Sequence, residues 1–380
     1  MSSSSERWFG AGHSTDADAG KAGAEAAAAA IAGRTPAAVF VFTSGGHDPT
    51  AVLAAVRAEA GGAVVAGGTG YGELTAAGAT EQGVAVAALG GAGFTVRAHA
   101  TDIGALGPRE AGAAAARVMA GVDAPHAALL LLCDGAALGP HEIVRGAYSV
   151  VGASVPLVGG LTLGPAGGQL LGDRVLTGSV VGVAIGSDHP IGIGLAHGWR
   201  RIEPPMLVTR CDGVRVYEFD GEPALDVLMR RYGTTGTAAE LFAGTRLRPL
   251  GLSRRSGEDI RSLHAGDDVE RSVFGTAEIP QGALVWPMEG EHDELVAGGG
   301  VAVREAVTAL GGAEPLGVLA FDCGGRKLTL GDSGTAEEVA VMRGVLGEVP
   351  FAGFYTMGEI ARVRGASGLH PLTLVALALA

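Results

Sequence analysis

Three apolar stretches of this chain end in a pair of small polar residues followed by glycine. The stretches are Phe40–Gly46, Leu129–Gly135 and Leu316–Gly324, with the polar pairs Thr43-Ser44, Cys133-Asp134 and Asp322-Cys323. Short polar side chains and bare backbone at the ends of buried strands are typical of places where α/β proteins hold ligands. The pattern therefore predicts a small-molecule site before any single residue does.

Each stretch opens the same order of expected elements: a strand, a helix, a second strand and a hairpin that leads to a closing strand. The second strands are expected at Val64–Glu73, Val155–Gly160 and Val349–Glu359, and the closing strands at Gly83–Leu89, Gly178–Ile185 and Leu372–Ala378. Crossover units combined with hairpins favour an α/β to α+β fold with mixed β-sheets flanked by helices. We expect repeated strand–helix–strand–hairpin units in two related halves.

In the third unit, Arg326 and Glu359 could together bind a zwitterion. Arg326 follows two glycines after the first strand, and a guanidinium can hold a carboxylate by two parallel hydrogen bonds. Glu359 stands near a strand end, where its carboxylate could bind an amine. The alternative is that Arg326 and Glu359 pair with each other. Tyr355 could add a hydroxyl or a stacking face, and core packing accounts for it equally well.

Glu73 and Cys323 are further candidates at strand ends. Glu73 follows a glycine in the first unit and could bind a ligand amine, or it could cap a turn or pair with an arginine. Cys323 could act as a nucleophile if Arg326 and His370 lower the pKa of its thiol. The alternative is a buried and inert thiol, as most free cysteines are. His370 is also a candidate ligand-binding residue.

The chain divides into four expected parts. Residues 1–12 are expected to form an N-terminal tail, and residues 13–200 a first domain. Residues 201–240 are expected to form a hairpin and helix connector, because Asp212-Gly213 between two alternating runs is a strong hairpin signal. Residues 241–380 are expected to form the second domain.

Composition excludes several classes of protein. The 380 residues carry a net charge of −13, which opposes binding to nucleic acids and to anionic membranes. The chain has 3 cysteines, at positions 133, 211 and 323, and an odd, sparse set is not a disulfide framework. No secretory signal and no membrane span are expected. We therefore expect a bacterial-type cytoplasmic protein.

Known motifs for metals, nucleotides and catalysis are absent from the sequence. It contains no Cys-x-x-Cys, His-Glu-x-x-His or EF-hand loop, so no metal site is expected. Gly68–Gly72 is not a dinucleotide fingerprint, and Gly135–Gly139 lacks the lysine of a phosphate loop. No Gly-x-Ser-x-Gly elbow is present. These absences favour a binding protein that catalyses nothing.

The order of several motifs resembles the FIST family, with an N-terminal and a C-terminal FIST domain adjoining. The resembling segments are Val155–Gly160, His197–Trp199, Asp220–Ala224, Pro249–Leu252, Arg261-Ser262, Ile279–Gly282, Phe321–Arg326, Val349–Ile360 and His370–Thr373. The chain departs from the family pattern at Met357, where a tyrosine is usual, and at Pro371, where an asparagine is usual. These departures concern the local pocket rather than the fold.

The resemblance implies a sensory protein of intracellular signal transduction that binds a small ligand. Amino acids and similar polar metabolites are the ligands proposed for the family. A ligand site near Arg326, Tyr355 and Glu359 would follow, together with an output protein that this sequence does not identify. No cofactor is expected under this interpretation.

Two alternatives belong to other functional classes. One branch of the family resembles haem-binding nitric-oxide sensors, and His197 is the candidate axial ligand for such a haem. A histidine beside Trp199 is, however, more often a hydrogen-bonded structural residue. The other alternative is an enzyme with Cys323 as nucleophile, His370 as base and Arg326 as anion clamp.

Overall fold

The computed structural model describes residues 6–380, except 138, 164–167, 244–246, 255–256 and 363–367. The first five residues of the expected tail thus lie outside the described residues, and Trp8–Ser14 forms strand β1. Within the described part of the chain, no helix combines the length and the apolar character needed to cross a bilayer. Its three cysteines are free thiols, which confirms that they form no disulfide framework.

The first of four β-sheets has the strand order β1-β6-β2-β3-β10-β11. Its strands are β1 (Trp8–Ser14), β6 (Val84–Gly90), β2 (Pro36–Ser44), β3 (Val64–Gly70), β10 (Gln169–Leu171) and β11 (Arg174–Leu176). Strands β2 and β3 are parallel and the other neighbours are antiparallel. The sheet is therefore mixed, as the sequence predicts.

The second and third sheets repeat this strand order. The second sheet comprises β7 (Phe94–Asp102), β12 (Ser179–Ser187), β8 (His126–Asp134), β9 (Leu157–Thr162), β25 (Glu359–Arg362) and β26 (Leu369–His370). The third comprises β13 (Ile191–Ala196), β27 (Leu374–Leu379), β23 (Gly317–Cys323), β24 (Phe351–Thr356), β4 (Glu73–Thr75) and β5 (Gly78–Thr80). In both sheets the two central strands are parallel.

Each of these sheets is completed by a hairpin from a distant part of the chain. The β4–β5 hairpin leaves β3 of the first sheet and pairs with β24 of the third. The β25–β26 hairpin leaves β24 and pairs with β9 of the second sheet, and β10 leaves β9 and pairs with β3. The exchange is cyclic, so the three sheets form one interlocked body.

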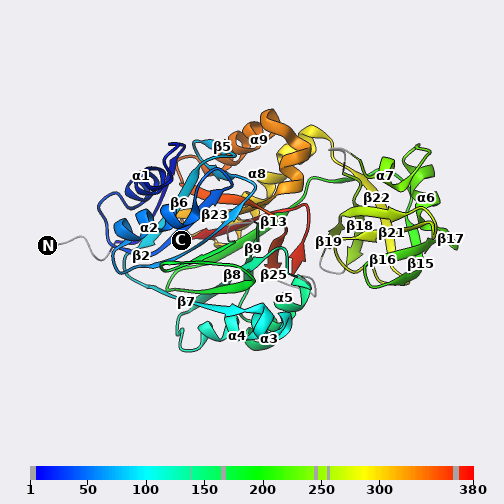
Figure 1. Cartoon of the computed structure of the whole chain (residues 1–380). Helices are drawn as coiled ribbons and strands as arrows, with labels where there is room; N and C mark the ends of the chain where they lie inside the picture. Colours follow the sequence, from blue (N-terminus) through cyan, green and yellow to red (C-terminus); the bar gives the residue numbers. More distant parts are fainter. Residues whose placement is uncertain (1–5, 138, 164–167, 244–246, 255–256, 363–367) are drawn as a thin grey trace.

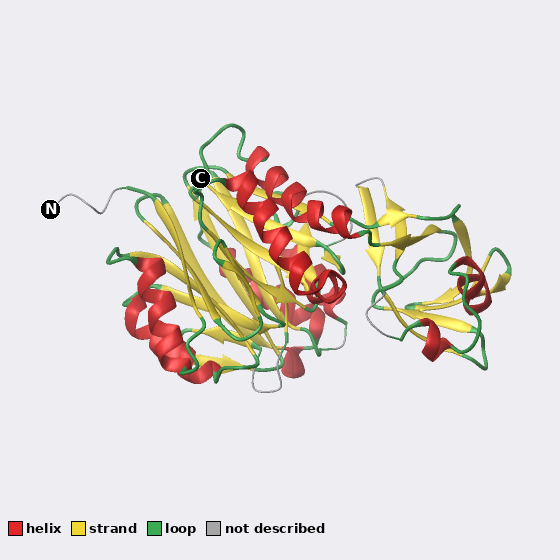
Figure 2. Cartoon of the chain, turned by 90° about the horizontal axis from the view of Figure 1, so that it is seen from above, coloured by secondary structure: helices red, strands yellow, loops and turns green. Residues whose placement is uncertain are grey.

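The inner faces of the three sheets share one apolar core. Phe42, Phe321 and Phe354 lie in it, and the rings of Phe42 and Phe354 stack with centroids 4.8 Å apart. Helices cover the outer faces, and Figure 2 shows them flanking the central strands. Helices α1 (Ala19–Ile31) and α2 (Pro49–Ala60) pack on the first sheet; α3 (Ile103–Leu106), α4 (Pro108–Ala116), the 3-10 turn η1 (Arg117–Met119) and α5 (Pro140–Val151) on the second; α8 (His292–Thr308) and α9 (Gly324–Leu346) on the third.

Small residues allow these layers to approach closely. A Cβ at Gly112 of α4 would lie 2.0 Å from the backbone oxygen of Ile143, and one at Gly146 of α5 would lie 1.9 Å from that of Arg109. Any larger residue at either glycine would separate α4 from α5. The high glycine content thus supports a core with few aromatic side chains.

Residues 200–289 form a separate body, the fourth-sheet domain, which lies beside the three-sheet body in Figures 1 and 2. Its strands are β14 (Arg200–Arg201), β15 (Met206–Asp212), β16 (Arg215–Phe219), β17 (Glu222–Pro223), β18 (Leu250–Arg254), β19 (Gly257–Arg261), β20 (Leu263–Asp267), β21 (Ser272–Gly275) and β22 (Leu284–Glu289). Helices α6 (Ala224–Arg231) and α7 (Ala238–Leu241) pack on a core of its own. The hairpin at Asp212-Gly213 is confirmed, because Asp212 pairs with Arg215 across the turn.

The fold is of the mixed α/β class that the sequence predicts. Its sheets group into three plus a fourth, however, and not into two halves. The fourth sheet takes strands both from the expected connector, residues 201–240, and from the beginning of the expected second domain. The connector residues pair across the fourth sheet with strands that follow them by up to about eighty residues, which a local sequence pattern does not show.

Candidate functional site

A cavity of about 510 Å³ opens where β23 and β24 end, between the three-sheet body and the fourth-sheet domain. We call it the interdomain cavity. Cys323 and Thr356 are paired at the last position of these parallel strands, and both line it. The other lining residues are Tyr71, Glu81, Leu247, Ser262, Thr276, Gly324, Gly325, Lys327, Leu328, Gly331, Asp332, Met357, Pro371 and Leu372. A hollow is thus present at one of the predicted strand ends.

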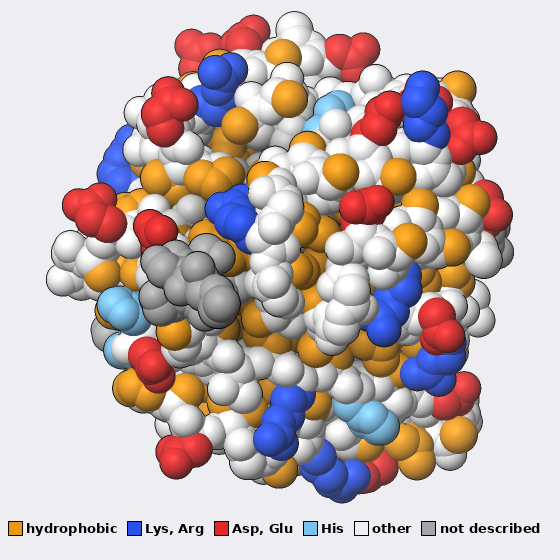
Figure 3. Space-filling model, turned by 90° about the vertical axis from the view of Figure 1, so that its left-hand side faces the viewer, with side chains coloured by type: hydrophobic (Ala, Val, Ile, Leu, Met, Phe, Trp, Pro, Cys, Tyr) orange, Lys and Arg blue, Asp and Glu red, His pale blue; other side chains and the backbone are white. Residues whose placement is uncertain are grey.

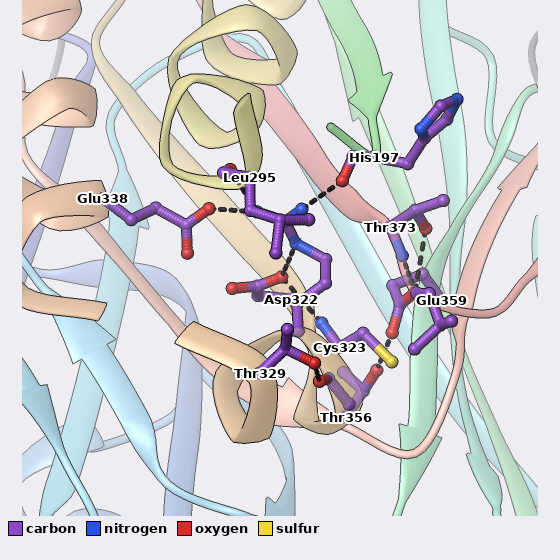
Figure 4. A network of polar contacts seen from close by, with 12 residues as sticks. His197, Leu295, Asp322, Cys323, Thr329, Glu338, Thr356, Glu359 and Thr373 are labelled. Atoms are coloured by element: carbon purple, nitrogen blue, oxygen red, sulfur yellow. Dashed lines mark hydrogen bonds and ion pairs between the residues drawn. The ribbon is translucent and has the colours of Figure 1, made fainter. Parts of the chain in front are cut away.

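Arg326 is fully buried and does not line this cavity. Figure 4 shows its partners Asp322, Glu338, Leu295 and His197. Its guanidinium donates to Asp322 Oδ1 (2.9 Å), to the backbone oxygen of Leu295 (3.0 Å), to Glu338 and to the backbone oxygen of His197. Burial would lower the pKa of Arg326, but Glu338 and Asp322 outweigh it and raise that pKa. Arg326 therefore joins β23, α8, α9 and the turn after β13.

The structure does not bring Arg326 and Glu359 together as an ion pair. Glu359 is buried and accepts from Thr356 Oγ1 (2.6 Å), from the Thr373 backbone N–H (2.9 Å) and from Thr373 Oγ1 (2.8 Å). Burial raises the pKa of Glu359 to about 8. The carboxyl thus carries a proton in much of the neutral range, and it ties the end of β24 to the start of β27.

Glu73 and Gln169 hold the positions equivalent to Glu359 in the other two exchanged hairpins. Each is the first residue of its hairpin and is fully buried. Glu73 accepts from Thr80 Oγ1 (3.0 Å), and burial raises its pKa to about 8. Gln169 donates to Thr162 Oγ1 (2.6 Å) and accepts from the Ser179 N–H (3.2 Å). Because a neutral amide makes the same connection, this position ties strand ends together without needing a charge.

Cys323 lacks the surroundings of an activated thiol. Burial, followed by the nearby carboxyl of Glu359, raises its pKa well above the ordinary value. The expected base, His370, faces elsewhere: its Nε2 lies 2.8 Å from the backbone oxygen of Ala361, and its Nδ1 lies 3.9 Å from Asp259. The nucleophile, base and clamp of the enzyme alternative are therefore not assembled.

Family comparison agrees with the resemblance read from the sequence. Residues 37–222 match the FIST N domain and residues 224–362 match the FIST C domain. The chain belongs to the FIST family. FIST domains are associated with signal transduction and with the sensing of small ligands.

Relatives of this FIST protein occur in mycobacteria. An uncharacterized protein of Mycobacterium tuberculosis is 30% identical over 96% of this chain and 97% of its own length. An uncharacterized protein of Mycobacterium bovis is 27% identical over 57% of this chain and 58% of its own. Among solved structures, T. maritima PurL complexed with ATP aligns at 12% identity with a TM-score of 0.24, over 98% of this chain and 71% of that one.

Several residues that line the cavity of this FIST protein were not singled out from the sequence. Lys327 is the clearest of them: its ammonium group pairs with Glu81 and lies 5.6 Å from the centre of the Tyr355 ring. Tyr355 itself is buried in the core between the third sheet and its helices. The signal for Lys327 was its place next to Arg326 at the start of a helix, where consecutive residues face different sides.

His197 lies in a second hollow, of about 550 Å³, whose lining is acidic. Its Nδ1 accepts from the Trp199 N–H (2.9 Å), so the ring proton lies on Nε2. Burial, followed by the charge of Arg326, lowers the pKa of His197 to about 4. Glu258, Glu294 and Glu305 line the same hollow, and their charge would oppose that of the haem propionates. With Nε2 protonated and like charges around it, this site does not fit haem.

Proposed function

We propose that this FIST protein binds a small carboxylate metabolite, such as an amino acid, in the interdomain cavity and serves as a sensor. The observation that carries the proposal is the make-up of the cavity wall. Lys327 contributes a cation, while Ser262 and Thr276 contribute hydroxyl-bearing side chains. A few polar groups in a largely apolar hollow are typical of small-molecule sites.

Lys327 is the group that we expect to receive the ligand carboxylate. Its side chain is 13% exposed, whereas its partner Glu81 is 69% exposed. An ion pair with so exposed a partner contributes little to stability, so a ligand carboxylate can replace Glu81 at small cost. Asp332 lies in the same wall and could pair with the ammonium group of an amino acid. Lys327, and not Arg326, would then bind the ligand carboxylate.

The position of the cavity suggests how binding could be reported. The fourth-sheet domain contributes Leu247, Ser262 and Thr276 to its lining, while the third sheet contributes Cys323 and Thr356. A ligand held between two bodies favours the arrangement in which both contact it. An output protein could then respond to the position of the fourth-sheet domain.

Isothermal titration calorimetry of the full chain against amino acids and related carboxylates tests this proposal. We expect saturable binding of at least one compound and a loss of about tenfold or more in affinity for Lys327→Gln, because a charge-assisted hydrogen bond is removed. Lys21→Gln is the matched control, since Lys21 pairs with Asp16 and Glu25 and does not line the interdomain cavity. Binding that is unchanged by Lys327→Gln, or no binding at all, would refute the proposal.

The haem alternative has a separate and simple test. Protein produced with haem supplied is expected to show no Soret band that depends on His197, for the reasons of tautomer and charge given above. A Soret band that His197→Ala abolishes would overturn this expectation.

A further inference from the structure

A third cavity between the two bodies, of about 280 Å³, is lined by three arginine side chains. We call it the basic cavity. Arg145 comes from α5 of the second sheet, Arg362 from the end of β25, and Arg261 from the end of β19 in the fourth-sheet domain. Figure 1 shows α5 and β25 beside β19. Three segments far apart in the sequence thus direct arginines to one place.

This concentration of positive charge is unusual for the molecule. The chain has a net charge of −13, and the face drawn in Figure 3 carries acidic and basic side chains interspersed. The lining of the basic cavity contains three arginines and one carboxylate, that of Glu278, while Glu142 and Asp259 pair with Arg145 and Arg261 from outside the lining. Like charges held close together in a partly enclosed hollow repel one another, and a bound anion relieves that repulsion.

Arg145 makes only a weak contact with the carboxylate that lines the basic cavity. Arg145 Nη1 donates to Glu142 (2.6 Å) outside the cavity, whereas its Nη2 lies 3.6 Å from Glu278 Oε2. Both side chains of the second pair are about half exposed, at 52% and 51%, so the contact adds little stability. An entering anion can displace Glu278 from Arg145 without breaking a strong interaction.

Arg261 and Arg362 are held in place by the protein. Arg261 is buried and donates through Nε to the backbone oxygen of Glu278 (3.0 Å) and through Nη1 to that of Ile260 (2.9 Å). Its Nη2 lies 3.5 Å from Asp259. The guanidinium of Arg362 lies over the ring of Tyr148. Positioned guanidinium groups lose little conformational freedom when they bind a planar or tetrahedral oxyanion.

We propose that the basic cavity binds a small dianion, a phosphoryl group or a short dicarboxylate, between Arg145, Arg261 and Arg362. The volume accommodates a group of that size and excludes a large polyanion. The site is separate from the interdomain cavity, and none of its lining residues is shared with it. Failure of one proposal therefore leaves the other standing.

Calorimetric titration of the full chain with inorganic phosphate, and separately with succinate, tests the proposal at constant ionic strength. We expect saturable binding of one of them, weakened about tenfold by Arg145→Gln and by Arg362→Gln. Glu278→Gln is expected to tighten binding, because it removes the competing carboxylate. The better ligand of the two identifies the source of the dianion.

Arg109→Gln is the matched control. Arg109 pairs with the same Glu142 as Arg145 does but does not line the basic cavity, so its replacement is expected to leave binding unchanged. All four replaced residues are at least partly exposed, which keeps the fold intact. No saturable binding of either anion, or equal weakening by Arg109→Gln and Arg145→Gln, would overturn the proposal.

Discussion

The parallel central strands of the second and third sheets end in the same geometry, but their acidic side chains stand at different positions. We call these two strand ends the second tip and the third tip. Their last paired positions are Asp134 with Thr162 and Cys323 with Thr356. One residue earlier, the second sheet has apolar Cys133 where the third has the buried Asp322. The second tip carries its acid at the end of the strand and an amide in the hairpin, whereas the third carries a thiol and an acid at those two places.

This comparison separates what the fold requires from what it tolerates. At both tips a buried side chain connects a threonine at the strand end to the start of the closing strand. This side chain is the amide of Gln169 at the second tip and the carboxyl of Glu359 at the third. The second tip has one carboxylic acid among these positions, Asp134, whereas the third has two, Asp322 and Glu359, and the charge of Asp322 adds to burial in raising the pKa of Glu359. Both side chains make this connection, although one is an amide and the other a carboxyl.

We expect the largest loss of stability when Arg326, which pairs with the buried acids at the third tip, is replaced. Arg326→Met leaves Asp322 and Glu338 buried without their cation, which typically costs about 3–5 kcal/mol. Urea unfolding measures the loss. A triple variant that also replaces Asp322 by Cys and Glu338 by Leu copies the apolar second tip and should recover most of it. If the triple variant is no more stable than Arg326→Met, the two tips are not equivalent.

Converting Glu359 to the amide of the second tip should remove a pH dependence. The pKa of Glu359 is raised to about 8 in the folded protein, so between about pH 4.5 and 8 the unfolded chain ionises this group and the folded chain does not. Stability therefore falls as pH rises through that window, by up to about 1.4 kcal/mol per pH unit. Glu359→Gln should flatten this slope in urea unfolding at pH 5, 6, 7 and 8. A slope identical to the wild type would show that Glu359 is already ionised when folded.

The reverse exchange should bring two acids together. Gln169→Glu removes the donor to Thr162 and adds a carboxyl where Asp134 already accepts from the Gly178 N–H, next to the Ser179 N–H that Gln169 uses. We expect a loss of roughly 2 kcal/mol at pH 7, since a buried hydrogen bond is lost and burial beside Asp134 forces the new carboxyl to take up a proton on folding. The loss should shrink at pH 5. A variant as stable as the wild type at pH 7 would contradict this.

Cys323 should behave as an inert side chain. We expect mild alkylation at neutral pH to modify the partly exposed Cys211 before Cys323, as peptide mass spectrometry would record. Cys323→Ser, which copies Ser44 at the end of β2, should change stability by less than about 1 kcal/mol. Faster modification of Cys323 than of Cys211 would restore the thiol as a functional candidate.

The sequence predicted the elements well and their partners poorly. Apolar runs closed by glycine identified β2, β8 and β23, because buried strands have a strong local signature. No local pattern states which sheet a hairpin joins, so the exchange of β4–β5 and β25–β26 was not foreseen. The hairpin at Asp212-Gly213 was foreseen because its turn chemistry is local.

In the candidate site, too, local features were predicted and long-range contacts were not. A polar cavity at the strand ends was predicted, but Arg326 was assigned to it in place of Lys327. Both residues follow the same glycines, and only the packing of α9 decides which faces inward. Glu338, twelve residues after Arg326, completes the buried network, and nothing in the sequence near Arg326 announces it.

The exchanged hairpins have a consequence for dissecting this protein. A fragment that spans only the FIST N match, residues 37–222, would lack β25 and leave the edge of β9 bare, while its own β4–β5 would have no β24 to pair with. Unpaired edges of this kind promote aggregation. The family boundary near residue 223 also divides the fourth sheet. The polypeptide must therefore be synthesised through both FIST matches before either can complete its hydrogen bonding.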